Sequence, residues 1–457
     1  MTVKKLRINL PDIVENLINS ITDAGYEAFA VGGCIRDSLL GIEPHDWDIA
    51  TSAMPTDIQR IFGGYQLIEV GKAHGTIGVV IDKKVYEITT YRIDGDYNDN
   101  RHPESVTFAK CIEDDLSRRD YTINSMAYNH DKGLVDPFNG QEDLKFKAIR
   151  CVGDPDTRFN EDALRILRGL RFSSVYNFSI SSATSTSIIK NRMLLNNISK
   201  ERISSELTKL LCGDNVQFIL NRYKDVFAVF LPEIVSTFDF SQNNPHHNKT
   251  VWRHITASVA NIEPDSTLRL VMLLHDIGKP LALVTDEKGV DHFKGHNHFG
   301  AVLAKNALER LKYPNKLIDD ICVLIEYHDV RFSDDKKKIK HVLNLIGEYN
   351  FSRLLKVQYA DMLAQSKYMR DIKLHNHEIA KKAFFEIIDN NECYSLKNLA
   401  INGSDIIHLG ITNGKMIGDI LNSILDEVID GTIENDAVLL KKKAIELYAE
   451  KKDKLPQ

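Results

Sequence analysis

Apolar and polar positions follow two different periods in the first third of the chain. Residues 9–24 carry apolar side chains three and four apart, a spacing that predicts a packing helix. Residues 75–81 and 85–91 alternate at every second position across three polar residues, which predicts a β-hairpin. Residues 92–108 are rich in turn formers and predict a long loop between strands. This order indicates a mixed sheet with helices in the N-terminal part.

The rest of the chain has mainly helical spacing. Residues 160–172 predict one helix with Asn160 as its N-cap, so that Asp162 and Arg165, three apart, share one face. Further helices are expected at 51–62, 198–211, 371–390 and 420–429. The glycines near the last of these, Gly410, Gly414 and Gly418, predict close helix or backbone contact.

Length and composition narrow the class of protein. A chain of 457 residues is too long for one core, so two to four domains are expected. Its six cysteines are scattered without a CxxC pair, which predicts reduced thiols and argues against a disulfide framework or a zinc knuckle. No apolar run approaches the roughly eighteen residues of a membrane helix, and the first residues lack a signal core. We therefore expect a soluble, cytoplasmic protein without membrane contact.

The charge is unevenly distributed. The net charge of −6 comes from 58 Lys and Arg against 64 Asp and Glu, but residues 143–212 contain twelve Lys and Arg and seven Asp and Glu. An RNA-binding enzyme need not be basic overall, but it then needs a local basic face. This segment would supply one, and binding to phosphates there would depend on salt.

A strand–turn–helix–strand unit near the N-terminus carries the first candidate site. An apolar run leads into Gly32 and Gly33, and the second strand carries Asp46 and Asp48. Residues two apart in a strand face the same side, so the two carboxylates would project together and bind Mg²⁺. The glycines allow close approach of phosphate oxygens, and Arg36 adds a cation. Together these residues indicate a nucleoside triphosphate held over a metal ion.

Further polar residues extend this candidate site. Glu87, in the second strand of the hairpin, would be a third acid or a solvated surface residue. The run that contains Arg118, Arg119, Asp120 and Asn124 precedes a short apolar helix. Guanidinium groups suit phosphate, and the amide of Asn124 suits ribose hydroxyls.

Asp162 and Arg165 allow two interpretations. They are either an ion pair on a solvated helix, worth a few tenths of a kcal/mol, or a carboxylate and a guanidinium that together read the edge of a base. Arg168, three residues further on, would support the second role.

Histidines and aspartates form a second constellation between residues 245 and 370. His254 lies on a predicted helix, His275 and Asp276 are adjacent, and Asp361 lies in a later helix. Imidazoles and carboxylates of this kind hold one or two divalent ions that activate water for attack on phosphate, with little selectivity among metals. Other candidates to line this pocket are His296, His298 and His328, with His296 preferred over His298. Scattered core and surface histidines, or a site whose activity has decayed, are the alternatives.

These motifs resemble a known family. Gly-Gly-x-x-Arg-Asp followed by Asp-x-Asp resembles the nucleotidyltransferase head of class II CCA-adding enzymes and bacterial poly(A) polymerases. The run from Arg118 to Ala127 resembles the family motif RRDxTINAxA, with Ser125 where alanine is usual, and residues 161–165 resemble its EDxxR motif. The histidine and aspartate order resembles HD-superfamily phosphohydrolases, which some bacterial CCA-adding enzymes carry as a domain with phosphatase and 2′,3′-cyclic phosphodiesterase activity.

The resemblance implies a fold and a domain order. The fold would be α+β, with a polymerase β-like mixed-sheet head followed by an all-α neck, an HD body and a helical tail. The expected ranges are 1–142 for the nucleotidyltransferase head, 143–230 for the neck with its base-reading helix, 231–370 for the HD body and 371–457 for a tRNA-binding tail.

The resemblance also implies a reaction, the template-independent addition of CCA to tRNA 3′ ends from CTP and ATP, together with an HD phosphohydrolase activity. The catalytic residues would be Asp46, Asp48 and Glu87, with Mg²⁺ on the two aspartates. The nucleotide-binding residues would be Gly32, Gly33, Arg36, Arg118, Arg119, Asp120, Asn124, Asp162, Arg165 and Arg168. His254, His275, Asp276 and Asp361 would hold a transition metal or Mg²⁺ at the HD site. A loop with Asp94, Asp96 and Arg101 would help to switch between CTP and ATP, and Glu201 and Arg202 would brace the neck helices.

Three rival functions stay open at this point. The first is a poly(A) polymerase or an enzyme that adds only CC or only A. The second is a nucleotide or alarmone hydrolase dominated by the HD site, although in alarmone enzymes the HD part comes first. The third is a non-catalytic RNA-binding scaffold, which the intact acids of both sites argue against. The sequence leaves the oligomeric state undetermined.

Overall fold

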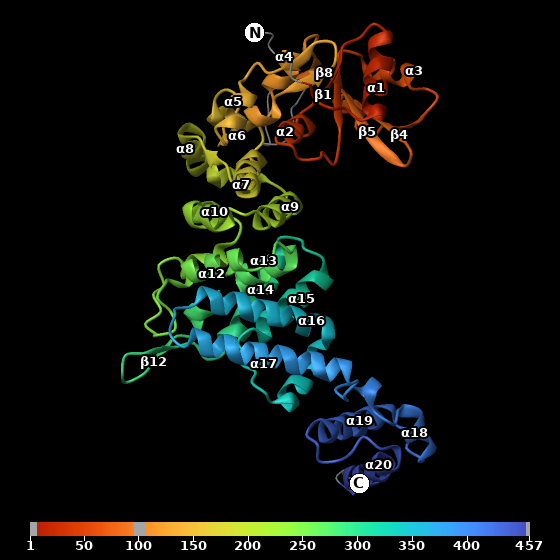
Figure 1. Cartoon of the computed structure of the whole chain (residues 1–457), viewed down its shortest axis with the longest axis vertical. Helices are drawn as coiled ribbons and strands as arrows, with labels where there is room; N and C mark the ends of the chain where they lie inside the picture. The colour runs from red at the N-terminus through yellow and green to blue at the C-terminus, as the bar shows by residue number, and fades with distance from the viewer. Residues whose placement is uncertain (1–6, 96–105, 454–457) are drawn as a thin grey trace. The chain divides into compact units, whose positions relative to one another are not determined.

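The chain divides into two compact units, each described by itself (Figure 1). The computed structural model describes residues 7–95 and 106–453. The first unit contains the described residues up to Val235 together with Arg310–Lys312, and the second contains Ser236–Glu309 and the described residues from Tyr313 onward. The expected division into head, neck, body and tail is finer than this partition and stays a prediction. Among the described residues, each helix is too short or too polar to cross a lipid bilayer.

A seven-stranded mixed sheet forms the core of the first unit, as predicted. Its order is β3-β4-β5-β2-β1-β8-β9, and β2 and β5 pair in parallel while the other neighbours are antiparallel. The strands are β1 (Ala28–Val31), β2 (Asp48–Thr51), β3 (Gln66–Ile68), β4 (Thr76–Ile81), β5 (Lys84–Thr90), β8 (Ala127–Asn129) and β9 (Gly133–Val135). β1 is apolar and buried along its whole length because it lies inside the sheet, between β2 and β8.

The hairpin and helix predictions for this region are confirmed, whereas both ends of the loop expected at 92–108 form short strands that pair with each other. The hairpin β4–β5 turns at Asp82 and Lys83, whose φ angles of 49° and 66° lie in the left-handed region that a two-residue type I′ turn requires. The helix expected at 9–24 is α1 (Asp12–Asp23), and that at 51–62 is α3 (Pro55–Ile61), with proline at its first turn. The remaining elements of this region are α2 (Gly33–Leu39), η1 (Lys72–His74), β6 (Arg92–Asp94), β7 (Val106–Phe108), α4 (Ile112–Ser117), η2 (Thr122–Asn124) and α5 (Gly140–Lys145).

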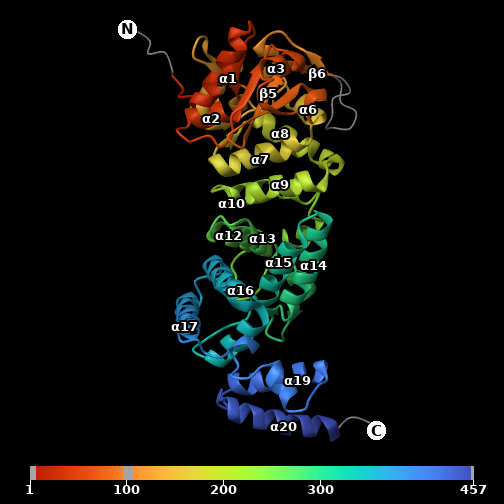
Figure 2. The same cartoon turned by 90° about the vertical axis from the view of Figure 1, so that its right-hand side faces the viewer.

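Helices complete the first unit, and α7, α9 and α10 follow one another below the sheet in Figure 2. These elements are β10 (Ala148–Ile149), α6 (Pro155–Glu161), α7 (Leu164–Tyr176), β11 (Ser179–Ile180), α8 (Ser182–Asn191), η3 (Arg192–Asn197), α9 (Lys200–Leu211), α10 (Val216–Arg222), α11 (Lys224–Phe227) and η4 (Pro232–Thr237).

The prediction of one helix over residues 160–172 is wrong. Asp162 adopts an extended backbone conformation (φ −135°, ψ 103°) that separates α6 from α7, and Asn160 lies inside α6. The Asp162 carboxylate accepts a hydrogen bond from the Leu164 backbone N–H at 3.0 Å, which favours a new helix start at this point. The N-cap of α6 is Asp154 instead, which accepts from the Thr157 N–H.

The second unit is almost entirely helical. Its elements are α12 (Val251–Asn261), α13 (Ser266–Leu274), η5 (Lys279–Leu281), β12 (Val284–Thr285), β13 (Asp291–His292), α14 (His296–Arg310), α15 (Asn315–Tyr327), α16 (Lys336–Ala364), α17 (Arg370–Asp389), η6 (Leu396–Asn398), α18 (Gly403–His408), α19 (Gly414–Ile429) and α20 (Ala437–Asp453). α12, α13, α15 and α16 pack together, and α17 packs along α16. α16 is kinked at Gly347, whose φ of 75° is outside the helical range.

The last helices have a hydrophobic core of their own. Ile406, Ile420, Ile424 and Leu440 are fully buried in it. Asn402 and Asp405 form a reciprocal capping box at the start of α18. The predicted close contact at Gly410, Gly414 and Gly418 is wrong, because a Cβ at each would meet nothing within 4 Å.

Candidate functional site

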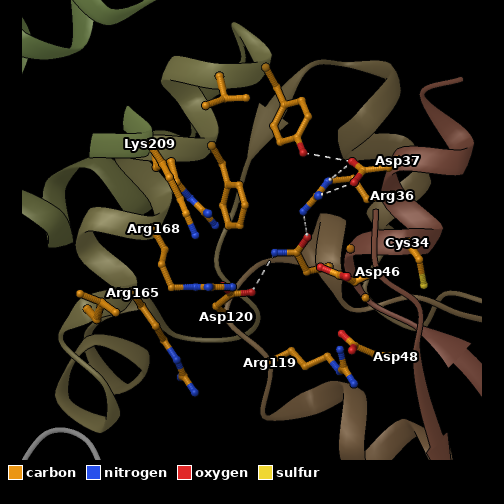
Figure 3. A pocket seen from close by; sticks show the side chains of 18 of the residues that line it. Cys34, Arg36, Asp37, Asp46, Asp48, Arg119, Asp120, Arg165, Arg168 and Lys209 are labelled. Carbon is orange, nitrogen blue, oxygen red and sulfur yellow. Dashed lines mark hydrogen bonds and ion pairs between the residues drawn. The ribbon is translucent and has the colours of Figure 1, made fainter. Parts of the chain in front are cut away.

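The residues predicted from the head and neck motifs meet in one cavity of about 840 Å³ in the first unit (Figure 3). Its lining includes Gly32, Gly33, Arg36, Asp46, Asp48, Arg118, Arg119, Asp120, Asn124, Asp162, Arg165 and Arg168. Glu87 is outside this set and lies beside it in β5. All the predicted nucleotide-binding residues are thus brought together by the fold.

The two aspartates line the cavity at the start of β2, an interior strand of the sheet. Asp48 is the first residue of β2, and Asp46 lies just before this strand. Glu87 lies on the neighbouring strand, since Ile49 of β2 is in register with Ile88 of β5. Two of the three carboxylates therefore come from adjacent strands, and Asp46, expected in the same strand as Asp48, comes from the segment just before β2.

The surroundings of Asp48 oppose its negative charge. Loss of water around the carboxylate raises its pKa above the ordinary value, and the charges of Glu87 and Asp46 raise it further, while Arg119 acts in the opposite direction. Among the described residues, neither Asp46 nor Asp48 has an ion pair or a side-chain hydrogen bond. The cluster therefore fits a divalent cation, which would offset this repulsion.

The turn after β1 brings a guanidinium close to these carboxylates. Gly32 has a φ of +81°, a conformation that glycine adopts readily, and a Cβ there would lie 2.7 Å from Nη1 of Arg119. Arg119 and Arg118 both bind Asp115, at 3.1 and 2.7 Å. Burial of Asp115 opposes ionisation, but the two arginines outweigh it and hold its pKa below the ordinary value. The arginine pair is thereby fixed at the cavity wall.

Arg36 is held by contacts within the protein. It is buried, its Nε donates to Asp37 at 2.8 Å and its Nη1 donates to Oδ1 of Asn124 at 2.6 Å. Its guanidinium lies 4.8 Å from the ring centroid of Tyr176, whose hydroxyl donates to Asp37 at 3.0 Å (Figure 3). Arg36 lines the cavity, but much of its donor capacity is already used.

Asp120 connects the head motif to α7. Its carboxylate accepts hydrogen bonds from Asn124 at 3.1 Å and from Nε of Arg168 at 2.7 Å. Burial raises the pKa of Asp120, but Arg168 and Asn124 outweigh burial and lower it to about 2. Asp120 is therefore a structural anion that positions Arg168 and Asn124.

Asp162 and Arg165 line the cavity, although not as a pair on one helix face. Asp162 binds Arg202 of α9 at 2.9 Å. Arg165 binds Glu161 at 2.5 Å and donates to the backbone carbonyl of Arg118 at 2.9 Å. Both side chains are held at the cavity by other partners.

Sequence reasoning missed part of this cavity. Arg202 and Lys209 of α9 and Arg171 of α7 also line it. The signal was the spacing of Arg202, Glu206 and Lys209, which places one face of α9 toward α7, where Glu206 binds Arg171 at 3.0 Å. Arg202, expected to brace the neck helices, binds Asp162 in the extended segment between α6 and α7.

The basic segment 143–212 is less available for binding than its charge indicates. At least seven of its twelve cations have a carboxylate partner within 4 Å, namely Arg150, Arg158, Arg165, Arg168, Arg171, Lys190 and Arg202. Most of this positive charge stabilises the unit itself.

The loop residues proposed for the switch between nucleotides are not tested. Asp96 and Arg101 lie outside the described residues. The backbone of Asp94 ends β6, which pairs with β7.

The predicted HD residues converge in the second unit. Nε2 of His254 lies 2.9 Å from Oδ1 of Asp361 and 3.2 Å from Oδ2 of Asp276, and Nε2 of His275 lies 3.2 Å from the same Oδ2. All four residues are buried. His275 uses Nδ1 to contact the carbonyl of Met272 at 2.8 Å, which directs Nε2 toward the carboxylates.

The charge of this cluster also suits a cation. Burial lowers the pKa of His275, but Asp276 and Asp361 outweigh burial and raise it to about 10. Lys279 adds a positive charge 2.7 Å from Oδ2 of Asp276. The two buried carboxylates thus draw positive charge, a requirement that a divalent ion also meets.

A second group of ligands lies at the other oxygen of Asp276. Nε2 of His296 and Nε2 of His328 lie 3.4 and 3.7 Å from Oδ1 of Asp276 and 3.2 Å from each other. Both rings are buried and use Nδ1 to contact backbone carbonyls at 2.7 Å. His298 is exposed and lies 3.4 Å from Glu326 instead, so the preference for His296 over His298 is confirmed.

Three family models match parts of this chain. The model described as "Poly A polymerase head domain" matches residues 28–150, and the one described as "Probable RNA and SrmB- binding site of polymerase A" matches residues 177–237. The model described as "tRNA nucleotidyltransferase domain 2 putative" matches residues 298–444.

Whole-chain comparisons agree with these matches. A CCA-adding enzyme of Ligilactobacillus salivarius (strain UCC118) is 32% identical over 455 residues, which cover 97% of this chain and 99% of that enzyme. A CCA-adding enzyme of Geobacillus thermodenitrificans (strain NG80-2) is 49% identical over 197 residues, 43% of this chain and 48% of that enzyme. A crystal structure of the Bacillus stearothermophilus CCA-adding enzyme in complex with CTP has a TM-score of 0.69 and 27% identity, with 98% of this chain and 100% of that chain covered.

Proposed function

Because the chain belongs to the CCA-adding enzyme family and is therefore a tRNA nucleotidyltransferase, we propose that it completes the 3′-terminal CCA of tRNA from CTP and ATP. The observation that carries the proposal is one cavity that contains Asp46 and Asp48 together with Asp162 and Arg165. The CTP complex of the Bacillus stearothermophilus relative supports the nucleotide.

Asp46 and Asp48, with Glu87 beside them, are the residues that would hold Mg²⁺. A bound Mg²⁺ would neutralise the triphosphate and lower the pKa of the primer 3′-hydroxyl. The 3′-oxygen attacks the α-phosphorus in line, the bond to the β-phosphate oxygen breaks, and pyrophosphate leaves. Arg118 and Arg119 would hold the phosphates, because their guanidinium groups are fixed at the cavity wall.

Asp162 and Arg165 would select the base. A carboxylate accepts from the amino group that cytosine and adenine share, and a guanidinium donates to a ring acceptor beside it. Since Asp162 is bound to Arg202 and Arg165 to Glu161, the base would share these partners or displace them. Arg168, bound to Asp120, would support Arg165 from the next turn of α7.

Incubation of a tRNA transcript that lacks CCA with each nucleotide, alone and combined, tests this function. We expect three added nucleotides with CTP and ATP together and none with GTP or UTP. A long adenylate ladder would indicate a poly(A) polymerase, and a stop after CC or a requirement for a CC end would indicate a partial activity.

Two variants test the assigned residues. Asp48→Ala should reduce incorporation roughly 10²–10³-fold or more while tRNA still binds, because the charge that balances the cation is lost. Asp131→Ala, at an exposed turn, is the matched control.

Arg165→Ala should weaken discrimination against GTP and UTP more than it weakens triphosphate binding. Intact discrimination would contradict base reading by α7.

We also propose a metal-dependent phosphohydrolase activity for the second unit. The buried convergence of His254, His275, Asp276 and Asp361 supports an HD-type site. His296 and His328 on the other side of Asp276 support a second cation position. A bound cation would polarise a phosphate ester and activate water.

Hydrolysis of phosphate esters with Mg²⁺, Mn²⁺, Co²⁺ or Ni²⁺ tests this activity. Asp276→Asn should abolish hydrolysis, since this carboxylate lies between both groups of histidines. Asp286→Asn, at an exposed turn of the same unit, is the control. If no metal supports hydrolysis, the phosphohydrolase proposal fails and nucleotidyl transfer is the one proposed activity that is left. If neither nucleotidyl transfer nor hydrolysis is observed, a binding scaffold is favoured.

A further inference from the structure

A lysine without a carboxylate partner lies in the cavity of the histidine and aspartate cluster. Lys373 of α17 and His246 line the same cavity of about 220 Å³ as Asp276 and Asp361. In the described part of the chain, Nζ of Lys373 contacts two neutral acceptors, Oε1 of Gln365 at 2.6 Å and Nδ1 of His246 at 3.2 Å. Burial and the charge of Arg331 oppose the positive charge of Lys373, whereas the charges of Asp361 and Asp329 favour it from beyond ion-pair distance. A bound anion would therefore stabilise this half-buried ammonium group.

These contacts position Lys373 relative to the metal ligands. Nε2 of buried Gln365 donates to Oδ2 of Asp361 at 2.8 Å, so one amide group separates Lys373 from a proposed ligand. The segment after α16 is fixed by Ser366, whose N–H donates to the carbonyl of His246 at 2.9 Å. Lys373 is therefore held at a defined place next to the cluster.

His246 supplies a second donor. Because its Nδ1 accepts from the ammonium of Lys373, the ring proton lies on Nε2. Burial lowers the pKa of His246, and the charges of Lys373 and Arg331 lower it further, against a hydrogen bond to the Tyr368 backbone that raises it. The ring also packs 4.9 Å from that of Tyr368, which fixes its orientation.

We propose that Lys373 and His246 bind one oxygen of the substrate phosphate and select a phosphomonoester over a cyclic phosphodiester, an inference that rests on the hydrolase function proposed above. A phosphomonoester has three non-bridging oxygens, and a 2′,3′-cyclic phosphodiester has two. Two oxygens suit the cation positions on either side of Asp276. The third oxygen of a monoester then faces Lys373 and His246, and a cyclic diester has none left for them.

Steady-state kinetics of the metal-loaded full chain tests this selection, with a nucleoside 3′-monophosphate and a 2′,3′-cyclic nucleotide as substrates. Lys373→Met should raise KM for the monoester roughly tenfold or more, because a charge-assisted hydrogen bond is lost. KM for the cyclic diester should change little, and Lys373→Arg should restore part of the monoester affinity. Lys382→Met is the matched control, because this lysine lies on the same helix with its side chain 81% exposed.

A binding measurement separates this inference from the hydrolase function. Titration calorimetry with inorganic phosphate and the metal-loaded chain needs no turnover, and Lys373→Met should weaken phosphate binding roughly tenfold with the bound metal unchanged. If neither substrate is hydrolysed but this loss is seen, the phosphate site stands and the hydrolase function fails. Equal effects on both substrates, a fall in bound metal, or unchanged phosphate affinity would each overturn the inference.

Discussion

Two aspartates in the same cavity have opposite electrostatic surroundings. At Asp48, loss of water raises the pKa, and the charges of Glu87 and Asp46 raise it further against the opposing charge of Arg119. Asp120 is beside Arg168 and Asn124, which outweigh burial and lower its pKa to about 2. The first arrangement leaves a carboxylate in need of a cation, and the second makes a fixed anion. Residue type alone therefore does not assign the role.

The pH dependence of nucleotide incorporation should report on Asp48. Protonation removes its affinity for a cation, so incorporation should fall as pH decreases through the raised pKa. Glu87→Gln removes one of the charges that raise the pKa of Asp48. We expect it to move the acid limb of the pH–rate profile to lower pH, independently of any change in the maximal rate. Glu69→Gln, at an exposed position of the same unit, should leave the limb in place.

Asp120→Asn should reduce stability at neutral pH. The lowered pKa of Asp120 contributes stability that is complete above its ordinary value of 3.8 and is lost as pH falls toward about 2. This shift corresponds to about 2 kcal/mol in the free energy of unfolding at pH 7. Urea denaturation of the variant and of Asp131→Asn measures the difference, and equal stabilities would contradict the assignment.

At the scale of elements, the packing of α7 against the head decides the shape of the cavity. The hydroxyl of Tyr121 donates to the carbonyl of Arg165 at 2.6 Å across this contact. Gly169 makes room for the ring, since a Cβ there would lie 2.2 Å from Oη of Tyr121. Because the helix breaks at Asp162, α7 begins at the cavity. Asp162 lines the cavity from an extended backbone, and Arg165 lines it from the first turn of α7.

Two helical glycines should respond differently to substitution. Gly169→Ala should lower the melting temperature and destabilise the first unit by about 1–3 kcal/mol, because Tyr121 has to move. Gly418→Ala in α19 should be neutral or stabilise by up to about 1 kcal/mol, because alanine favours a helix and nothing lies within 4 Å. Calorimetry of both variants measures the effects, and a stable Gly169→Ala variant would refute the tight contact.

At the scale of the whole molecule, the two candidate sites lie in different compact units. The cavity with Asp46 and Asp48 belongs to the first unit, and the cluster around Asp276 belongs to the second. The proposed ligands differ as well, with carboxylates alone in the first site and imidazoles in the second. The two sites should therefore be separable by mutation and by metal.

Each site should be inactivated without loss of the other. Asp48→Ala should retain phosphate-ester hydrolysis, and Asp276→Asn should retain nucleotide incorporation within about twofold, because residues without shared partners usually act additively. Parallel assays of both variants check this expectation. Loss of both activities in either variant would mean that the units depend on each other.

Metal removal should distinguish the sites in the same way. After treatment with a chelator, Mg²⁺ alone should restore incorporation, since carboxylate oxygens suit this ion. Hydrolysis should recover better with Mn²⁺, Co²⁺ or Ni²⁺, because imidazole ligands favour transition metals. The two activities would be followed in one chelated preparation, and identical metal preferences would argue against the assigned ligand sets.

Much of the site was determined by the sequence alone because its signals are local. Asp46 and Asp48 lie on one short segment, and so does the run from Arg118 to Asn124. His254, His275, Asp276 and Asp361 are spread over residues 254–361, and their order was identified by its resemblance to HD-superfamily enzymes. Spacing within a short segment defines which side chains project together whatever the rest of the chain does. The mixed sheet, the hairpin and most helices followed from the same patterns.

Only the tertiary structure decided which distant residues meet. Strand register places Glu87 beside Asp48, and helix packing brings Arg202 to Asp162, a contact that replaces the predicted pair with Arg165. Packing in the second unit likewise brings Lys373 to the cluster around Asp276. These neighbours are far apart in the sequence, and no local period encodes them, because register and packing depend on the burial of the whole core.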